Sequence, residues 1–401
     1  MPAALPPPWN ELLTSRARIE LPTPFGRPRR AGLARFDFGG GRPDPESFPF
    51  DDLARATADM LAAEGRDALT YGDQQGAPGL REWVREKTLL LEQDEIGPEQ
   101  VLITSGASHA LSLIADALTE PGDDIVTEAP LFSGTLNVFR RHAVRMHGVR
   151  VDEQGLDVDH LASVLSDLRR AGRRAKFIYT VPTFQNPTGV TLPLARRHEV
   201  LRLARAHETV IVEDDAYGEL RFEGERLPTL HLLDHDDIVL RVGTISKTLG
   251  AGMRLGWVIA NPRLLPVLMG FKGDGGTAPF TSRVAAHYMR AHFTTHLAEL
   301  IRVYRDKRDA MLAGLRDGLG DSATWSVPAG GFFIWLRLPA GTDPVRLLEL
   351  AAEAEVAHVA GPAFYPDSSG SEYVRLAFSY ATLAEITEGM GRFCAAVQAA
   401  R

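Results

Sequence analysis

"RVGTISKTLGAGMRLGWVIA", residues 241–260, places one lysine, Lys247, between two hydroxyl residues at the end of an apolar run. Arg254 follows seven residues later in a glycine-rich turn. Apolar runs stand on both sides of this turn and predict two buried strands. A lysine directly after a buried strand is poorly placed to be a solvated surface residue. We therefore treat Lys247 as a candidate nucleophile, with Arg254 as a partner for an anion.

Short apolar runs alternate with helical stretches through the middle of the chain. The runs are VLITSG (101–106), DIVTEAP (124–130), KFIYTVP (176–182), TVIVEDDAY (209–217), DIVLRVGTIS (237–246) and LGWVIA (255–260). This alternation predicts an α/β fold with a mostly parallel sheet covered by helices on both faces.

The C-terminal part has a different pattern. An amphipathic helix is predicted after about residue 295, followed by two alternating strands, GGFFIWLRLP (330–339) and YVRLAFSYA (373–381). This pattern predicts a smaller α+β domain. We expect an N-terminal arm with part of the small domain over 1–48, a large domain over 49–295 and a small C-terminal domain over 296–401.

Composition limits the classes of function. The 401 residues carry a formal charge of −8, which argues against a nucleic-acid binder. The single cysteine, Cys394, excludes an intramolecular disulfide and a cysteine-rich metal site, and we expect it to be a small core residue. The sequence has no apolar run of about 18 residues and no secretory signal pattern at its start. These features predict a soluble cytoplasmic protein without a membrane partner.

Polar residues stand at the ends of the predicted strands, where open α/β sheets bind ligands. TSGASHA (104–110) opens a helix that could hold a phosphate, although it could also be an ordinary strand-to-helix turn. NPTG (186–189) by itself predicts only a turn. Asp214 follows the apolar Val-Ile-Val, and a carboxylate buried there requires a partner.

Taken in order, TSGASHA, NPTG, EDDAYGEL, TISKTLGAGMRLGW, PAGGFFIW and VRLAFS closely resemble the class I/II aminotransferases, in the branch with 2-aminoadipate and broad-range enzymes. The resemblance runs from about Phe36 to the C-terminus. It implies pyridoxal 5′-phosphate (PLP) as cofactor and fold type I, with a mostly parallel seven-stranded sheet in the large domain. It implies transfer of an amino group from an α-amino acid to a 2-oxo acid by a ping-pong mechanism.

The same scaffold leaves other functions open. A PLP-dependent amino-acid oxidase or lyase of a specialised pathway is the main alternative. A ligand sensor attached to a DNA-binding helix-turn-helix is a remote one, because only about 35 residues precede the region of resemblance.

The resemblance also implies roles for the residues around the cofactor ring. Lys247 would hold PLP as a Schiff base and act as general acid and base, and Asp214 would pair with the pyridine nitrogen. Asp215 would point the other way on an extended chain. Asn186 and Tyr217 would hydrogen-bond the phenolic oxygen. Phe132 would stack on the ring in place of the more usual tyrosine.

The cofactor phosphate requires several donors. The residues implied for it are Gly106, Ala107, Ser108, Thr244, Ser246 and Arg254. Tyr71, in "LTYGDQQG", matches a tyrosine that reaches the phosphate from the neighbouring subunit, which implies a homodimer with shared active sites. Alternatively, Tyr71 packs beneath its loop.

Substrate binding is implied at Arg375, whose planar guanidinium would hold the α-carboxylate, with help from Asn186 and from the backbone of Gly41. Three departures from the family pattern affect specificity. Arg42 replaces the usual leucine, and it either accepts a side-chain carboxylate or points to solvent. The segment after Lys272 is rich in glycine over 273–276, and the arm before Phe36 is interrupted by prolines.

Overall fold

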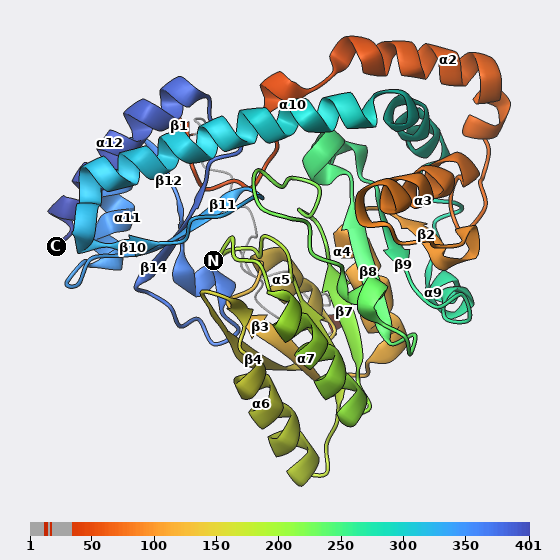
Figure 1. The fold of residues 1–401 in the computed structure, drawn as a ribbon, viewed down its shortest axis with the longest axis horizontal. Helices are drawn as coiled ribbons and strands as arrows, with labels where there is room; N and C mark the ends of the chain where they lie inside the picture. The colour runs from red at the N-terminus through yellow and green to blue at the C-terminus, as the bar shows by residue number, and fades with distance from the viewer. Residues whose placement is uncertain (1–11, 15–16, 18–33) are drawn as a thin grey trace.

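The structure is a computed structural model that describes residues 12–14, 17 and 34–401. Its main feature is an eight-stranded sheet with the strand order β2-β9-β8-β7-β6-β3-β4-β5 (Figure 1). The strands are β2 (Val101–Thr104), β3 (Asp124–Ala129), β4 (Arg145–Asp152), β5 (Gly155–Leu156), β6 (Ala175–Thr180), β7 (Val210–Asp214), β8 (Val239–Thr244) and β9 (Gly256–Ile259).

Most of this sheet is parallel, as the sequence predicts. The strands from β4 through β3, β6 and β7 to β8 all run in one direction. Only β9 and the two-residue β5 pair antiparallel with their neighbours. β5 brings the number of strands to eight, where the resemblance implied seven. The sequence analysis also missed β4, because this strand lies beside the short edge strand and carries mostly polar side chains.

Helices cover both faces of the large sheet because parallel strands need crossover connections. One face is covered by α4 (Ala107–Leu118), α5 (Ser133–Arg141) and α9 (Leu265–Phe271). The other face is covered by α6 (Val158–Arg170), α7 (Leu194–Ala206) and α8 (Leu230–Leu233), with α3 (Pro78–Glu92) at the β2 and β9 end. The apolar strand residues are therefore buried on both sides, which explains their nearly continuous apolar character.

A second sheet contains the C-terminal strands. Its order is β10-β11-β14-β13, with antiparallel pairing throughout. The strands are β10 (Thr324–Trp325), β11 (Phe333–Arg337), β13 (Val359–Ala360) and β14 (Tyr373–Ala377). A separate parallel pair joins β1 (Phe36–Asp37) to β12 (Val356–Ala357), so the chain just before the large sheet lies beside the C-terminal region. The helices here are α11 (Pro344–Glu353) and α12 (Leu383–Ala399).

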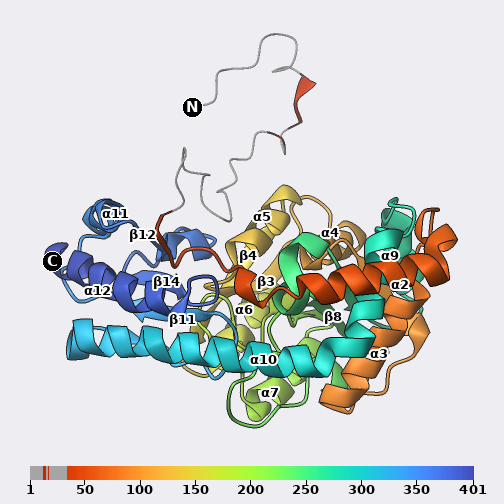
Figure 2. The same cartoon turned by 90° about the horizontal axis from the view of Figure 1, so that it is seen from above.

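One long helix, α10 (Pro279–Leu319), connects the two regions (Figure 1). It packs against α12 at one end and against α3 and α2 (Phe50–Ala68) toward the other, and Figure 2 shows α2 lying along it. The helix begins earlier than the sequence predicts because buried Tyr288, Met289 and Phe293 hold a stretch of modest helix propensity in place. The predicted domain boundary at 295 thus falls inside α10, and the division into domains stays a prediction.

Several other expectations can be placed. Cys394 is buried in α12, beside the backbone oxygen of Gly314, and is a core residue. Within the described part of the chain, no helix is long and apolar enough to cross a membrane, and no group of side chains is suited to hold a metal ion. The proline-interrupted arm, residues 20–30 above all, lies outside the described residues.

Candidate active site

A pocket of about 340 Å³ lies where the carboxyl ends of β6, β7 and β8 meet the second sheet. This edge is where a parallel sheet of this kind binds its ligands. Most of the residues nominated from the sequence line it: Gly41, Arg42, Ala107, Ser108, Phe132, Asn186, Asp214, Tyr217, Thr244, Ser246, Lys247, Arg254 and Arg375. Gly106 and Tyr71 do not.

Lys247 enters the pocket from a single turn of π-helix, Ser246–Gly250, that follows β8. Its Nζ donates to the backbone oxygen of Gly41 at 2.9 Å and lies 5.5 Å from the ring centre of Tyr217. Burial, together with the positive charge of Arg375, lowers the pKa of Lys247 to about 8. A substantial fraction of this amine is therefore neutral near physiological pH, as a nucleophile or base requires.

Asp214 is the last residue of β7 and points into the same pocket. Its Oδ2 accepts a hydrogen bond from the Tyr179 hydroxyl at 2.7 Å, while its buried Oδ1 has no partner among the described residues. Burial raises the pKa of Asp214 to about 6. A buried carboxylate oxygen without a donor is costly, so the pocket is prepared for a ligand that carries an N–H or a positive charge.

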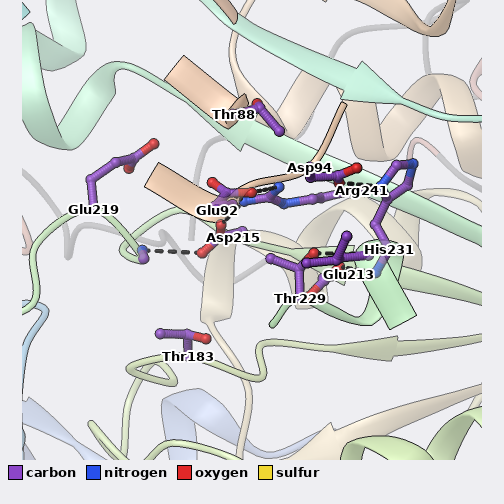
Figure 3. A network of polar contacts seen from close by, with 12 residues as sticks. Thr88, Glu92, Asp94, Thr183, Glu213, Asp215, Glu219, Thr229, His231 and Arg241 are labelled. Carbon is purple, nitrogen blue, oxygen red and sulfur yellow. Dashed lines mark hydrogen bonds and ion pairs between the residues drawn. The ribbon is translucent and has the colours of Figure 1, made fainter. Parts of the chain in front are cut away.

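Asp215 lies on the opposite face, as predicted. It forms an ion pair with Arg241, which also pairs with Glu92 (Figure 3). Lys87 joins the network through Glu219 at 2.9 Å and Glu92 at 3.4 Å. All five side chains are buried, and together they link α3 to β8 and to the segment that follows β7.

Asn186, Tyr217 and Arg375 form a hydrogen-bonded chain across the pocket. The Asn186 amide donates to the Tyr217 hydroxyl at 3.3 Å, and its oxygen accepts from Arg375 at 3.0 Å. A second Arg375 nitrogen donates to the Gly39 oxygen at 2.6 Å, and the guanidinium stacks over Phe333 at 4.3 Å. The Nε of Arg375 is buried without a partner among the described residues. Burial lowers the pKa of Arg375 to about 10, so the group remains a cation.

The other end of the pocket is suited to a phosphate. It contains the N-terminus of α4, which begins at Ala107 after Gly106 with a positive φ of 86°. The Arg254 guanidinium lies against this turn, and a Cβ at position 106 would come within 3.0 Å of it. Ser246 and Ser108 add hydroxyls. Thr244 differs, since its hydroxyl is directed to Ser246 and the Leu255 oxygen.

The glycine loop before η2 (Pro45–Ser47) closes the substrate side. A Cβ on Gly41 would lie 2.5 Å from the Phe333 ring, so only glycine fits there. Arg42 pairs with Asp37 and stacks on the Tyr380 ring at 3.9 Å, and it also lines the pocket. The two alternatives for Arg42 stay predictions, since its side chain lines the pocket and is also 38% exposed.

Tyr71 lies outside the pocket, with 93% of its surface exposed. It is not packed beneath its loop. Instead, its ring lies beside Gly275, where an added Cβ would approach it to 2.7 Å, and Gly72 donates to the Gly275 oxygen at 2.9 Å. The glycine-rich stretch therefore supports the loop that carries Tyr71.

The sequence analysis missed several residues that line the pocket. The most important is Tyr179, and the others include Leu111, Thr135, Val181 and Phe333. Tyr179 could have been found by combining two signals. It pairs in register with Val212 on the neighbouring strand, and Asp214, two residues further on, faces the same side. The tyrosine and the carboxylate must therefore lie close together.

This fold, with a lysine, a carboxylate and a phosphate-binding helix end around one pocket, defines a PLP enzyme of fold type I. The chain belongs to the class I and II aminotransferases, whose family model matches residues 36–393. It is 36% identical to aromatic-amino-acid aminotransferase 1 of Thermococcus litoralis over 90% of this chain and 87% of the relative. It is likewise 36% identical to 2-aminoadipate transaminase of Thermus thermophilus, over 91% of this chain and 90% of the relative.

A solved structure supports the same assignment. The kynurenine aminotransferase of Pyrococcus horikoshii, determined in complex with PMP, superposes with a TM-score of 0.88 at 34% identity, over 92% of each chain. The family uses pyridoxal phosphate. The described pocket fits this cofactor: the free oxygen of Asp214 suits a protonated ring nitrogen, and Arg254 with the α4 N-terminus suits the phosphate.

Proposed function

We propose that this enzyme moves the amino group between α-amino acids and 2-oxo acids with Lys247 as both the anchor of the cofactor and the proton carrier. One observation supports this most strongly. A single pocket contains the Lys247 amine and two buried atoms that have no partner among the described residues, one oxygen of Asp214 and the Nε of Arg375. These three groups match a ring aldehyde, a ring nitrogen and a substrate carboxylate.

When bound, PLP supplies an electron-withdrawing ring that stabilises negative charge at the substrate α-carbon. Lys247 would accept the proton that leaves the substrate α-carbon and donate it again, and its lowered pKa suits the amine to both roles. Asp214 holds the proton on the ring nitrogen through its free oxygen. Asn186 and Tyr217 bind the phenolic oxygen, and Phe132 covers one face of the ring.

The remaining residues bind phosphate and substrate. Arg254, Ser246 and Ser108 bind the phosphate together with the backbone N–H of Ala107, the first residue of α4. Thr244 acts through its hydrogen bond to the Ser246 hydroxyl, and Gly106 provides the turn before α4. Arg375 binds the α-carboxylate, for which its free Nε is an available donor. Gly41 lets the Phe333 ring pack against its backbone, because no side chain fits there, and the Gly41 oxygen accepts from Lys247.

The substrate class follows from the relatives and from the lining. The relatives are named for aromatic amino acids, 2-aminoadipate and kynurenine. Phe333 offers an aromatic surface, while Arg42 offers a cation that is already paired with Asp37. We therefore place α-amino acids with a large aromatic or dicarboxylic side chain first.

Single-turnover measurement without 2-oxo acid tests this function. An α-amino acid donor should convert the bound cofactor to its aminated form, with one 2-oxo acid released per site and no dependence on oxygen. Oxygen uptake would indicate an oxidase. Continuous ammonia release with the cofactor unchanged would indicate a lyase. A screen of amino acids against 2-oxoglutarate and pyruvate then identifies the substrates.

The active unit in this proposal is a homodimer in which Tyr71 reaches the phosphate of the partner subunit. An aromatic side chain that is 93% exposed, on a loop supported by Gly275, supports this role. Mixing refolded K247A and Y71A subunits tests it. If the sites are shared, activity should rise to about one quarter of wild type, because half of the random dimers contain one intact site. Activity that stays at the sum of the two variants would contradict sharing.

A cytoplasmic location completes the proposal. The sequence contains one cysteine, which is buried, so the fold needs no oxidising compartment. Cell fractionation with an antibody against the native protein checks the location.

A further inference from the structure

Glu128 is a buried carboxylate at the end of β3 that has no role in the chemistry described above. Three donors surround it. Its Oε1 accepts from the Thr180 hydroxyl at 2.5 Å and from the Val181 N–H at 3.0 Å. Its Oε2 accepts from the Gln185 side-chain amide at 3.0 Å. Every partner donates, so the arrangement is built for the ionised carboxylate, which only accepts.

Gln185 closes the turn that carries Asn186. Its side-chain oxygen accepts from the N–H and the hydroxyl of Thr188, at 2.9 and 2.7 Å. Its backbone N–H donates to the Val190 oxygen at 2.9 Å. Its side-chain nitrogen is directed to Glu128 and to the Pro130 oxygen, at 2.7 Å. The orientation of this one amide therefore determines the shape of the turn.

We propose that Glu128 is a positioning residue for substrate binding, because its ionised carboxylate fixes the amide of Gln185 and so holds Asn186 between Arg375 and Tyr217. The Thr188 N–H and the Pro130 oxygen require the orientation in which the Gln185 nitrogen faces position 128, and an acceptor-only carboxylate matches it. A glutamine at position 128 would place its nitrogen against either the Gln185 nitrogen or the Val181 N–H, so in both orientations a donor would face a donor. Asn186 would shift, and Arg375 would lose the 3.0 Å contact that orients it toward the substrate carboxylate.

The pKa of the Glu128 carboxyl depends on its burial and on the groups around it. Burial raises its pKa to about 7, against the effect of the three donors. Among the described residues, the other titratable groups that act on it or respond to it are Asp214 and Tyr179, and the negative charge of Asp214 raises its pKa further. Protonation below neutral pH would remove the acceptor-only character. The Michaelis constant for the amino acid is thus expected to rise as the pH falls through about 7.

The experiment compares E128Q with E213Q in the PLP-loaded enzyme. Glu213 is the matched control: it is a buried glutamate on β7, which β6 separates from β3, and it accepts from Leu230 and His231 at the start of α8, away from the pocket. At pH 8, E128Q should raise KM for the amino donor about tenfold and change kcat less than threefold. Its KM should also lose the rise at acidic pH that the wild type shows. E213Q should leave KM unchanged.

A rescue variant separates positioning from general damage. In E128Q/Q185E the charge changes places: the new amide nitrogen at position 128 can donate to the new carboxylate at position 185, and the contacts to Thr180, Val181 and Thr188 can form again. Because the carboxylate at position 185 also meets the Pro130 oxygen, which only accepts, KM should fall part of the way back toward the wild-type value. An unchanged KM in E128Q at all pH values, an equal rise in E213Q, or no rescue by the double variant would overturn the inference. If E128Q accumulates unfolded, Q185A makes the same comparison, and an unchanged KM there would also overturn it.

The inference rests on the proposed roles of Asn186 and Arg375, and one variant distinguishes the two failures. If N186A raises KM and E128Q does not, only the role of Glu128 is wrong. If N186A leaves KM unchanged as well, the proposed substrate site is wrong.

Discussion

The two faces at the end of β7 carry neighbouring aspartates in opposite surroundings. Asp215 lies in an ion network in which Arg241 and Lys87 face three carboxylates. Arg241 makes ion pairs with two of them, Glu92 and Asp215 (Figure 3). Within the part of the chain that the structure describes, Asp214 accepts one hydrogen bond, from Tyr179, and its other buried oxygen has no donor. Both sites are buried, but only the network is nearly satisfied.

The difference separates stability from function. A buried charge with partners fixes how the strands and α3 pack together. Its effect on the free energy of unfolding becomes measurable when one partner is removed and the other charge is left unpaired. A buried charge without partners raises the free energy of the empty protein, and a ligand that supplies the missing partner recovers it. The pocket cations follow the same rule, since burial lowers the pKa of both Lys247 and Arg375.

The sharpest test removes one cation from each site. K247M should reduce turnover by at least about 10³-fold, because the anchor and the proton carrier are lost together. Its melting temperature without cofactor should be unchanged or higher, since a buried amine with a lowered pKa is replaced by an apolar side chain. Steady-state assays and calorimetry measure the two effects. A large loss of stability would show that Lys247 belongs to the structural network.

R241M should give the opposite result. It leaves Glu92 and Asp215 without their main partner, and breaking a buried pair in this way costs about 3–5 kcal/mol of unfolding free energy. Turnover per folded molecule should stay within a few-fold of wild type. Denaturant unfolding followed by active-site titration checks both. If R241M kept its stability and lost its turnover, the ion network would contribute to catalysis and not to stability, which would contradict the expected difference between the two sites.

Acidification should disable the two sites at different pH values. The raised pKa of Asp214, about 6, means that the apoprotein takes up a proton there as the pH falls, and PLP affinity should drop by up to about tenfold per pH unit below 6. Although burial alone would raise it, Arg241 and Lys87 hold the pKa of Glu92 down at about 2. The stabilisation from Glu92 is present above its unfolded value, about 4.3, and is lost as the pH falls through 2.

The pH ranges in which PLP affinity and stability are lost can be measured on the same apoprotein samples. PLP binding is followed by absorbance, and folding is followed by far-UV circular dichroism, between pH 8 and pH 2. If structure were lost already at pH 6, the prediction that Glu92 stays ionised in the ion network down to much lower pH would be wrong.

Y179F should have the smallest effect. It removes the hydroxyl that donates to Asp214, so the charged carboxylate loses support and its pKa rises. The acid limb of kcat/KM should move to higher pH, with a loss of a few-fold at pH 8, in line with about 1 kcal/mol for one hydrogen bond. A pH–rate profile measures the shift. A profile identical to wild type would show that Tyr179 does not act on Asp214.

Much of the architecture was predictable because its signals are local. The runs that became β2, β3, β6, β7, β8 and β9 are apolar and bounded by turn residues. The start of α10 and the edge strand β4 were not, because packing against other elements outweighs their weak local patterns. Most nominated pocket residues lie together, yet Tyr179 and Glu128 were missed, since Tyr179 acts on a residue of the neighbouring strand and Glu128 acts on the turn after β6.

The sequence by itself determined which chemical groups are present and in what order they stand at strand ends: a lysine after β8, two aspartates at the end of β7 and an arginine in β14. Only the tertiary structure decided which aspartate was satisfied and which was left open. The physical reason is that burial and hydrogen-bond partners set the charge state of a side chain, and these partners come from segments far apart in the chain. Arg241 and Glu92 are 149 residues apart, and Arg375 and Asn186 are 189 apart.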